Sequence, residues 1–168
     1  MNTIDEKDLI YLAGFFDGDG SVIAKFIYHK DYVKTRPYQI SLTVQFTQAT
    51  KRRWFLETIK TIVGEGNVRD RKTGNVSDYC IVGPAAVERF LKQIQPYLRL
   101  KKKQANLALR IIEQLPHSKD PEKFYELCYM VDQIAALNDS KTRTITAAVV
   151  IARMKAALEE IDPVETEE

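Results

Sequence analysis

Residues 11–21 read Tyr11-Leu-Ala-Gly-Phe-Phe-Asp-Gly-Asp-Gly-Ser21, an apolar run that ends in two aspartates set between glycines. The apolar residues predict a helix with one broad hydrophobic side, and the glycines predict its end. Thr3 and Glu6 have the spacing of a capping box, so we expect this helix to begin beside Thr3. The segment therefore predicts a short helix whose carboxyl end carries negative charge.

Two features of this helix need a cause outside it. Gly14 and Gly18 lie four residues apart, and an interior glycine costs about 0.5–1 kcal/mol relative to alanine. Close approach of another helix is the usual reason for small residues on one face. Asp17 and Asp19 stand at the carboxyl end, where the helix dipole disfavours negative charge, and a bound cation would reverse that penalty.

Two other structures place aspartates in a similar pattern. A core helix that ends in an Asp-Gly turn accounts for the dipeptide, and the residues alone leave that alternative open. An EF-hand calcium loop is excluded, because Val22 stands where that loop needs glycine and Tyr28 stands where it needs a bidentate glutamate.

The rest of the chain alternates between paired strands and helices. Strands are predicted at residues 21–28 and 38–48, and a hairpin at 67–82 that turns at 72–75. Helices are predicted at 50–63, 84–95, 102–115, 121–137 and 145–160. This order predicts an α+β fold with a four-stranded, mainly antiparallel sheet and extra C-terminal helices. We expect a single domain over residues 1–160 and an acidic, flexible tail over 161–168.

Composition narrows the classes of protein to which the chain can belong. No apolar run is long enough to cross a bilayer, which predicts a soluble globular protein with no membrane partner. The first residues match neither a secretory signal nor an Arg-rich transit peptide. Two cysteines without a Cys-x-x-Cys spacing exclude a disulfide framework and a thiolate zinc site. Two histidines provide almost no ligands for a His-rich site.

Charge is unevenly distributed along the chain. The last ten residues hold six acids and no base, so residues 1–158 carry 25 basic and 17 acidic residues, a net charge of +8. A basic body with an acidic end is typical of proteins that bind nucleic acid, although charge alone is equally consistent with solubility.

One predicted strand carries a polar face of unusual composition. Residues 38–48 alternate strictly, and the polar side chains include Gln39, Ser41, Thr43 and Gln45. Solvation alone would favour Lys and Glu, whereas Gln, Ser and Thr offer donors and acceptors that suit base edges. An ordinary half-exposed sheet would show the same alternation. In the hairpin, Arg69 and Arg71 share one strand face, and Asp78 and Cys80 share a face of the partner strand.

Several segments in order resemble the intron-encoded, single-motif members of the LAGLIDADG homing endonuclease family. Residues 11–21 are similar to the motif that names the family. The other similar segments are Phe46–Trp54, Val68–Arg71, Ser77–Tyr79, Lys101–Asn106 and Asp132–Arg143. The resemblance covers roughly residues 5–145. It implies the LAGLIDADG fold with its αββαββα core, and Mg²⁺-dependent hydrolysis of both DNA strands by a homodimer.

The resemblance implies a role for each residue of a catalytic group. Asp19 is the metal ligand at the foot of the motif helix, with the Gly18 carbonyl as a neighbouring oxygen ligand. Gln48 orients water, Lys101 stabilises charge on the phosphate, and Arg52 belongs to the same solvent network. These hard oxygen ligands suit Mg²⁺, two or more ions per dimer, with Mn²⁺ as a substitute. One strong acid per chain is too few for a two-metal centre, which makes dimerisation necessary.

By the same resemblance, the sheet and its loops bind the DNA major groove while the motif helix packs against its twin. The implied DNA-binding residues are Ile23, Lys25, His29, Lys30, Tyr32, Lys34, Arg36, Gln39, Ser41, Thr43, Gln45, Arg69, Arg71, Asp78, Cys80, Lys141 and Thr142. The implied dimer contacts are Leu12, Ala13, Gly14, Phe15, Phe16 and Asp17, of which Asp17 also caps locally. A strand of about ten residues spans about 33 Å, so a two-fold dimer would read about twenty base pairs of pseudo-palindrome.

The family further implies 3′ overhangs, a role in intron mobility, a gene carried by an organelle intron, and no small-molecule cofactor. Trp54, Phe55 and Phe90 are expected in the core. Two Asp-x-Lys triplets, at 70–72 and 139–141, match a restriction-type nuclease, but such triplets occur easily by chance.

Binding without cleavage is the second hypothesis, as a DNA-binding regulator or an intron RNA maturase of the same fold. Loss of the acid, the glutamine or the lysine would favour it, and all three are present. A passive interaction domain fits the polar strand faces poorly.

Overall fold

The computed structural model describes residues 3–32, 36–139 and 142–161, and its elements follow the predicted order. The helices and strands are α1 (Glu6–Asp19), β1 (Gly20–Tyr28), β2 (Tyr38–Ala49), α2 (Arg53–Val63), β3 (Asn67–Asp70), β4 (Val76–Val82), α3 (Pro84–Ile94), α4 (Lys102–Gln114), α5 (Pro121–Leu137) and α6 (Ala147–Ile161). Short 3₁₀ turns are η1 (Lys30–Tyr32), η2 (Thr50–Arg52), η3 (Gln95–Tyr97) and η4 (Leu115–His117). Within the described ranges, no helix is long and apolar enough to cross a membrane.

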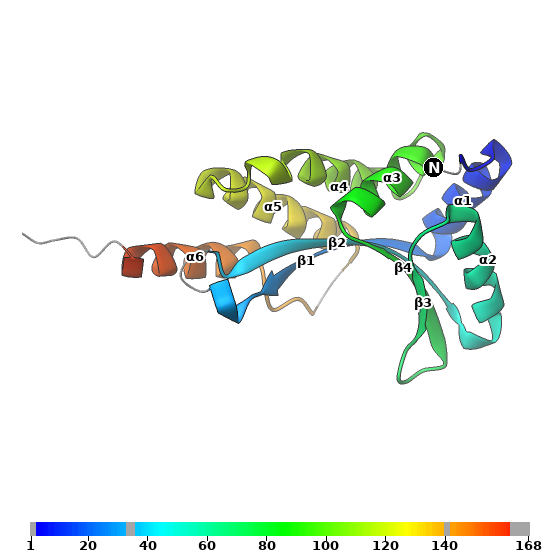
Figure 1. The fold of residues 1–168 in the computed structure, drawn as a ribbon, viewed down its shortest axis with the longest axis horizontal. Helices are drawn as coiled ribbons and strands as arrows, with labels where there is room; N and C mark the ends of the chain where they lie inside the picture. Colours follow the sequence, from blue (N-terminus) through cyan, green and yellow to red (C-terminus); the bar gives the residue numbers. More distant parts are fainter. Residues whose placement is uncertain (1–2, 33–35, 140–141, 162–168) are drawn as a thin grey trace, which may run out of the picture.

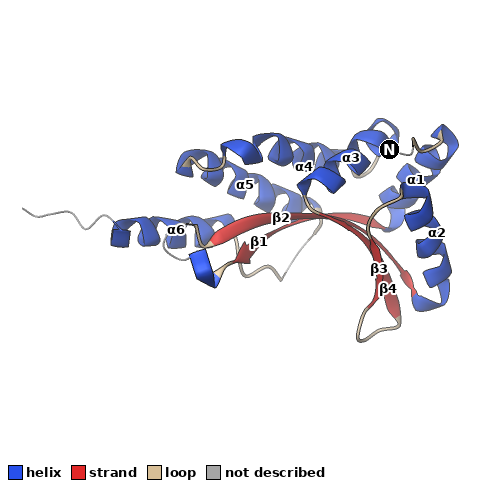
Figure 2. Cartoon of the chain, in the orientation of Figure 1, coloured by secondary structure: helices blue, strands red, loops and turns tan. Residues whose placement is uncertain are grey.

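The four strands form one sheet in the order β1-β2-β4-β3, and every neighbouring pair is antiparallel. The predicted α+β fold with an antiparallel sheet is therefore confirmed. Figures 1 and 2 show α3, α4 and α5 on one side of this strongly curved sheet. Its concave side is bare of helices along β2 and β4, as far as the described residues show. The α1 and α2 helices lie at one end of the sheet, and α6 extends past the other.

The core lies between the sheet and the helices that cover it. The even-numbered side chains of β2 point into it, and Phe46 is fully buried. Its ring packs edge-on against Phe16 of α1 and Phe90 of α3, and stacks with Tyr79 of β4. Period-two alternation thus gives β2 one buried face and one face turned to the concave side.

Three sequence expectations about the fold were wrong in detail. The α1 helix is capped by Asp5 and not by Thr3: the Asp5 carboxylate accepts the backbone N–H of Lys7 at 2.9 Å, and its charge is favoured by the helix dipole. Trp54 is 67% exposed, since the buried stripe of α2 runs through Leu56 and Ile59 on another side of the helix. Finally, α6 continues through 161, a residue expected in the tail, and residues 162–168 lie outside the described part.

Candidate functional site

Three of the predicted catalytic residues form one hydrogen-bonded chain at the foot of α1. Asp19 is the last residue of that helix and is exposed. The Gln48 amide, near the end of β2, donates from Nε2 to Oδ2 of Asp19 at 2.6 Å. Arg52, in the turn before α2, donates from Nη1 to Oε1 of Gln48 at 3.4 Å. The amide is therefore held with its nitrogen toward the carboxylate and its oxygen toward the guanidinium.

Lys101 and Asp17 join the end of α1 to the start of α4 by reciprocal caps. Lys101 Nζ donates to the carbonyls of Phe16 at 3.1 Å, Asp17 at 3.0 Å and Gly18 at 3.5 Å. The Asp17 carboxylate accepts the backbone N–H groups of Arg99 at 2.8 Å and Lys101 at 2.9 Å. A cation thus lies at the carboxyl end of one helix and an anion at the amino end of the other, the favourable sign at both.

The pKa shifts of this pair follow from its surroundings. Burial opposes ionisation of Asp17, but the backbone amides of Lys101 and Arg99 outweigh burial and lower the pKa of that carboxyl. Burial also lowers the pKa of Lys101, with Asp17 and then Asp19 acting in the opposite direction. Asp17 therefore stays ionised as a structural cap.

Oxygen ligands for a metal are available at the foot of α1, but one chain offers few of them. Gln48 bonds Oδ2 of Asp19, while Oδ1 accepts no hydrogen bond that the described residues show. The Gly18 carbonyl holds only the longest of the three Lys101 contacts. Such hard oxygens suit a divalent cation of the Mg²⁺ type. Among the described residues, no group of three or more acids, histidines or cysteines could hold a metal within a single chain.

The polar faces of the four strands combine into one surface on the concave side of the sheet. Strand register places Gln45 between Ser21 and Cys80, and Thr47 beside Asp78, which in turn faces Arg69. The predicted strand residues that share this face are Ile23, Lys25, Gln39, Ser41, Thr43, Gln45, Arg69, Asp78 and Cys80. The same face also carries Ser21, Thr47 and Asn67. They were not among the predicted DNA contacts, although the period-two alternation of the strands indicates their side of the sheet.

Two residues expected to meet DNA are buried on that face. Asp78 is 1% exposed, and Arg71 holds its carboxylate with Nε and Nη2, each at 2.8 Å. Thr47 donates to the same carboxylate at 2.7 Å. Cys80 is 6% exposed, and its thiol lies 3.5 Å from Oε1 of Gln45. Asp78 and Cys80 thus bond the side chains of Thr47, Arg71 and Gln45 around them, and part of the Arg71 guanidinium is occupied by Asp78.

Arg36, also predicted at DNA, is tied to the helical side of the sheet. It donates to the Ser118 carbonyl at 2.6 Å and lies 4.7 Å from the centre of the Phe124 ring. Burial lowers its pKa. An arginine with an apolar ring and a carbonyl within reach satisfies part of its donors locally, so a DNA contact by Arg36 stays a prediction that these local contacts do not favour.

The remaining loop residues are only partly described. His29 and Gln39 share a hydrogen bond at 2.9 Å. Lys30 and Tyr32 form the ends of η1, and Thr142 is exposed. The predicted contacts Lys34 and Lys141 lie outside the described residues.

The face of α1 that is free to meet another chain differs from the predicted one. Leu12, Ala13 and Phe16 are buried in the chain's own core, because they lie on the side of the helix that packs toward the sheet. Of the predicted contacts, Gly14 is exposed, and Phe15 and Asp17 are partly buried. The exposed apolar residues at this end of the molecule are Ile10, Tyr11, Trp54 and Leu100.

No contact within this chain requires a glycine at the two glycine positions of α1. A Cβ atom added at Gly14 or Gly18 would meet nothing within 4 Å. Glycine weakens a helix, and the packing of this chain alone therefore does not explain why glycine stands at these two positions.

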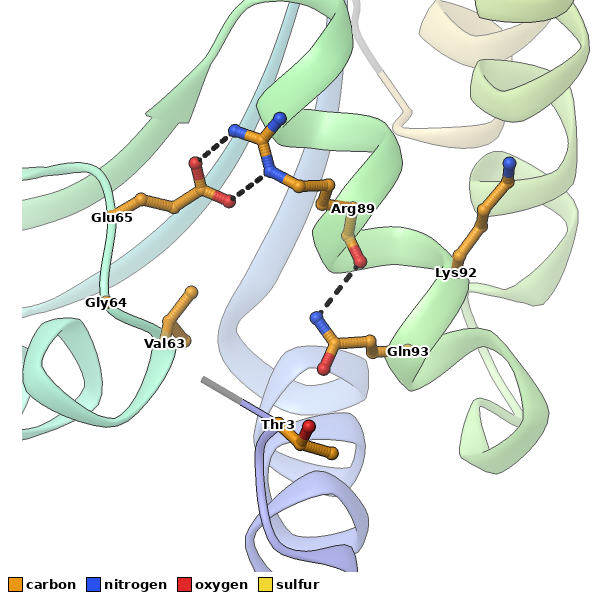
Figure 3. A pocket seen from close by; sticks show the side chains of 7 residues that line it. All are labelled: Thr3, Val63, Gly64, Glu65, Arg89, Lys92 and Gln93. Carbon is orange, nitrogen blue, oxygen red and sulfur yellow. Dashed lines mark hydrogen bonds and ion pairs between the residues drawn. The ribbon is translucent and has the colours of Figure 1, made fainter. Parts of the chain in front are cut away.

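A cleft elsewhere on the molecule takes no part in this constellation. It lies between α3 and the segment after α2, with a volume of about 430 Å³, and Figure 3 shows its lining. Arg89 and Glu65 neutralise each other there, with the closest pair of atoms 2.6 Å apart. None of the predicted catalytic or DNA-binding residues lines it.

Comparison with known proteins identifies the fold and the motif. Residues 12–113 match the LAGLIDADG endonuclease family. The chain is 54% identical to DNA endonuclease I-CreI of Chlamydomonas reinhardtii over 154 residues, 90% of this chain and 92% of that protein. It is 40% identical to DNA endonuclease I-CvuI of Chlorella vulgaris over 146 residues, 87% of this chain and 89% of the relative.

Solved structures agree with these sequence relatives. A crystal structure of I-CvuI bound to an I-CreI target in the presence of Mg superposes with a TM-score of 0.85 at 36% identity, covering 93% of this chain and 98% of the other. The archaeal homing endonuclease I-Vdi141I in complex with DNA shares the fold, with a TM-score of 0.78 at 18% identity, over 90% of this chain and 97% of that one. On the family match and the two relatives, the chain belongs to the LAGLIDADG endonuclease family.

Proposed function

We propose that this chain is a site-specific homing endonuclease that hydrolyses both strands of a long DNA site as a homodimer. The observation that carries the proposal is the group at the foot of α1. Asp19, Gln48 and Arg52 form one hydrogen-bonded chain, and Lys101 caps the same helix end. This group stands at one end of a concave sheet face lined with donors and acceptors for base edges.

Dimerisation is supported by glycines and exposed apolar side chains that the packing of a single chain does not explain. The exposed stripe of α1 contains Gly14 and Gly18, where a second backbone can approach closely. Leu100 is 73% exposed, Trp54 67% and Ile10 51%. A second copy packed on this face would cover apolar side chains and bring two Asp19 carboxylates together. The dimer therefore supplies the second acid that a single chain lacks.

A divalent metal fits the donors at this place. Asp19 and the Gly18 carbonyl would hold Mg²⁺, which Mn²⁺ could replace, and the bound ion would polarise the phosphate and lower the pKa of water. DNA phosphate and the second copy would supply the remaining ligands, with two or more ions per dimer.

The side chains around Asp19 have separate tasks in the proposed reaction. Gln48 cannot accept a proton at neutral pH, so it orients water and the Asp19 carboxylate rather than acting as a base. Lys101 uses three donors on backbone carbonyls, the weakest at 3.5 Å to Gly18. Exchanging that contact for a phosphate oxygen would place positive charge where negative charge develops.

The concave face sets the length of the proposed DNA site. The β2 strand has 12 residues, about 40 Å at 3.3 Å each, which is long enough to cover a half-site of roughly ten base pairs at about 3.4 Å each. A two-fold dimer would then read about twenty base pairs of pseudo-palindrome. Staggered breaks with 3′ overhangs, intron mobility and a gene in an organelle intron complete the proposal.

The test is a cleavage selection on a library of long inverted-repeat duplexes in Mg²⁺, with Asp19→Asn run in parallel. We expect cut sites from the unmodified protein only, and the same sites bound by both proteins. Sites that are enriched by binding but yield no cut ends in either sample would overturn the nuclease and support a DNA-binding regulator. No enrichment of any duplex, together with retention of intron RNA, would support a maturase.

A further inference from the structure

The Thr47 hydroxyl on the concave face has no spare hydrogen-bonding capacity. A hydroxyl has one proton to donate and two lone pairs. Thr47 donates to Oδ1 of Asp78 at 2.7 Å and accepts from Nη2 of Arg71 at 3.4 Å and from Nε2 of Gln45 at 3.2 Å. Because the ionised Asp78 can only accept, the direction of the first bond is fixed. The other two positions on Thr47 must therefore face donors.

The fixed direction of the Thr47–Asp78 hydrogen bond also determines the orientation of the Gln45 amide. The Thr47 oxygen can only accept a hydrogen bond from Gln45, because its one proton is donated to Asp78. Gln45 must therefore turn its amide nitrogen, not its oxygen, toward Thr47. On the other side, the thiol of Cys80 donates to Oε1 of Gln45 at 3.5 Å. Burial raises the pKa of Cys80, which keeps that thiol protonated. Both neighbours thus favour the same one of the two orientations of the amide.

The fixed amide leaves one donor and one acceptor for another molecule. Gln45 is partly exposed on the concave face, and each end of its amide holds one bond to the network. One N–H of Nε2 and one lone pair of Oε1 remain, side by side and in a set order. In the major groove, adenine presents a donor beside an acceptor, whereas guanine presents two acceptors.

We propose that Thr47, held by Asp78 and Arg71, is a positioning residue that makes Gln45 select one base, adenine, at one base pair of each half-site. This inference rests on the proposed DNA-binding function and assigns part of its specificity to a side chain that does not itself need to touch a base. Without the hydroxyl, the Gln45 amide can turn over and the base discrimination falls.

The experiment compares cleavage of four versions of the selected site that differ at a single position. That position is first located as the one where Gln45→Ala removes the base preference. Thr47→Val keeps the shape of the side chain and removes the hydroxyl, and Thr47→Ser keeps the hydroxyl. Thr61→Val makes the same change at an exposed threonine of α2, outside the proposed DNA-binding residues. Ratios of kcat/KM between the four bases are taken within each protein, so differences in total activity cancel.

We expect the unmodified protein, Thr47→Ser and Thr61→Val to prefer adenine at that position by roughly 5- to 150-fold, the range for one bidentate contact. Thr47→Val should lose most of that ratio while keeping its preferences at the other positions. In a Gln45→Ala background, Thr47→Val should change the ratio no further, because both act through one contact.

Three results would overturn the inference. They are an unchanged ratio in Thr47→Val, an equal loss in Thr47→Ser, and a preferred base other than adenine in the unmodified protein. If Thr47→Val does not fold, Thr47→Ala takes its place with the same expectation. If the unmodified protein cuts no site at all, the proposed function fails, which this comparison distinguishes from failure of the positioning role.

Discussion

Replacing Asp17 by alanine removes the carboxylate that joins the first and fourth helices. That carboxylate accepts two backbone N–H groups, from Arg99 and Lys101, at 2.8 and 2.9 Å. Hydrogen bonds to a charged group contribute about 1.5–3 kcal/mol each. Because Asp17 is partly exposed, water would replace part of what is lost, and we expect a total cost of about 2 kcal/mol. For a chain of this size, that corresponds to a fall in Tm of about 4–8 °C.

Asp19, two residues further on, should behave in the opposite way. Its side chain is exposed, and an asparagine there still accepts the Gln48 hydrogen bond through its oxygen. Removing a negative charge from the carboxyl end of α1 also relieves an unfavourable interaction with the helix dipole. We therefore expect Asp19→Asn to unfold no more easily than the unmodified protein, although it loses DNA cleavage.

The assay is urea unfolding followed by circular dichroism at one fixed protein concentration, since a dimer would make stability depend on concentration. Asp17→Asn is the matched control, because its amide has one acceptor in place of two carboxylate oxygens and should lie between alanine and the unmodified chain. An unchanged urea midpoint for Asp17→Ala would refute the capping role. So would an equal loss of stability in Asp19→Asn, because the two aspartates would then not have separate tasks.

Three further predictions concern the core, pH and assembly. Phe90→Ala empties a fully buried ring position and should cost about 3–5 kcal/mol in urea unfolding; a loss below about 1 kcal/mol would contradict the packing. Although burial opposes its ionisation, the hydrogen bonds from Arg71 and Thr47 lower the pKa of Asp78. Its contribution to stability should be present above pH 4 and lost as the pH falls through that lowered pKa, and unfolding of Asp78→Asn should lack this part of the pH dependence. Leu100→Glu charges an exposed position, so sedimentation should show a folded monomer; an unchanged dimer would place the interface elsewhere.

Much of the fold could be predicted because local pattern and tertiary role coincide in it. The strict alternation over 38–48 fixed which side of β2 would hold Phe46 and which would hold Gln45, and the structure has them so. The α1 helix was harder, because an apolar run shows that a side is buried but not which buried residues face a second chain. Leu12 was assigned to a contact between chains and belongs to the core of one.

Partners that are distant in sequence account for the other residues whose surroundings differ from those expected. Arg36 looked like one more basic residue in a basic loop, and nothing near it in sequence indicates that Ser118 and Phe124 lie within its reach. Asp78 looked available to DNA until the cross-strand register placed Thr47 and Arg71 around its carboxylate. Alternation along a strand predicts on which face of the sheet a side chain lies. Which side chains surround it there depends on the order and register of the strands.

The strand β2 also explains why core packing matters to the chemistry. Gln45 and Thr47 share one parity along this strand and face the concave side, whereas Gln48 has the parity of the buried positions and reaches Asp19. A slip of one residue in strand pairing would exchange the two sets. It would send the side chains proposed to contact bases into the core, and the amide proposed to orient water to the concave face. Phe46, fixed among the rings of Phe16 and Phe90, opposes such a slip. The aromatic core therefore holds the proposed base-contacting side chains and the proposed catalytic group in register with each other.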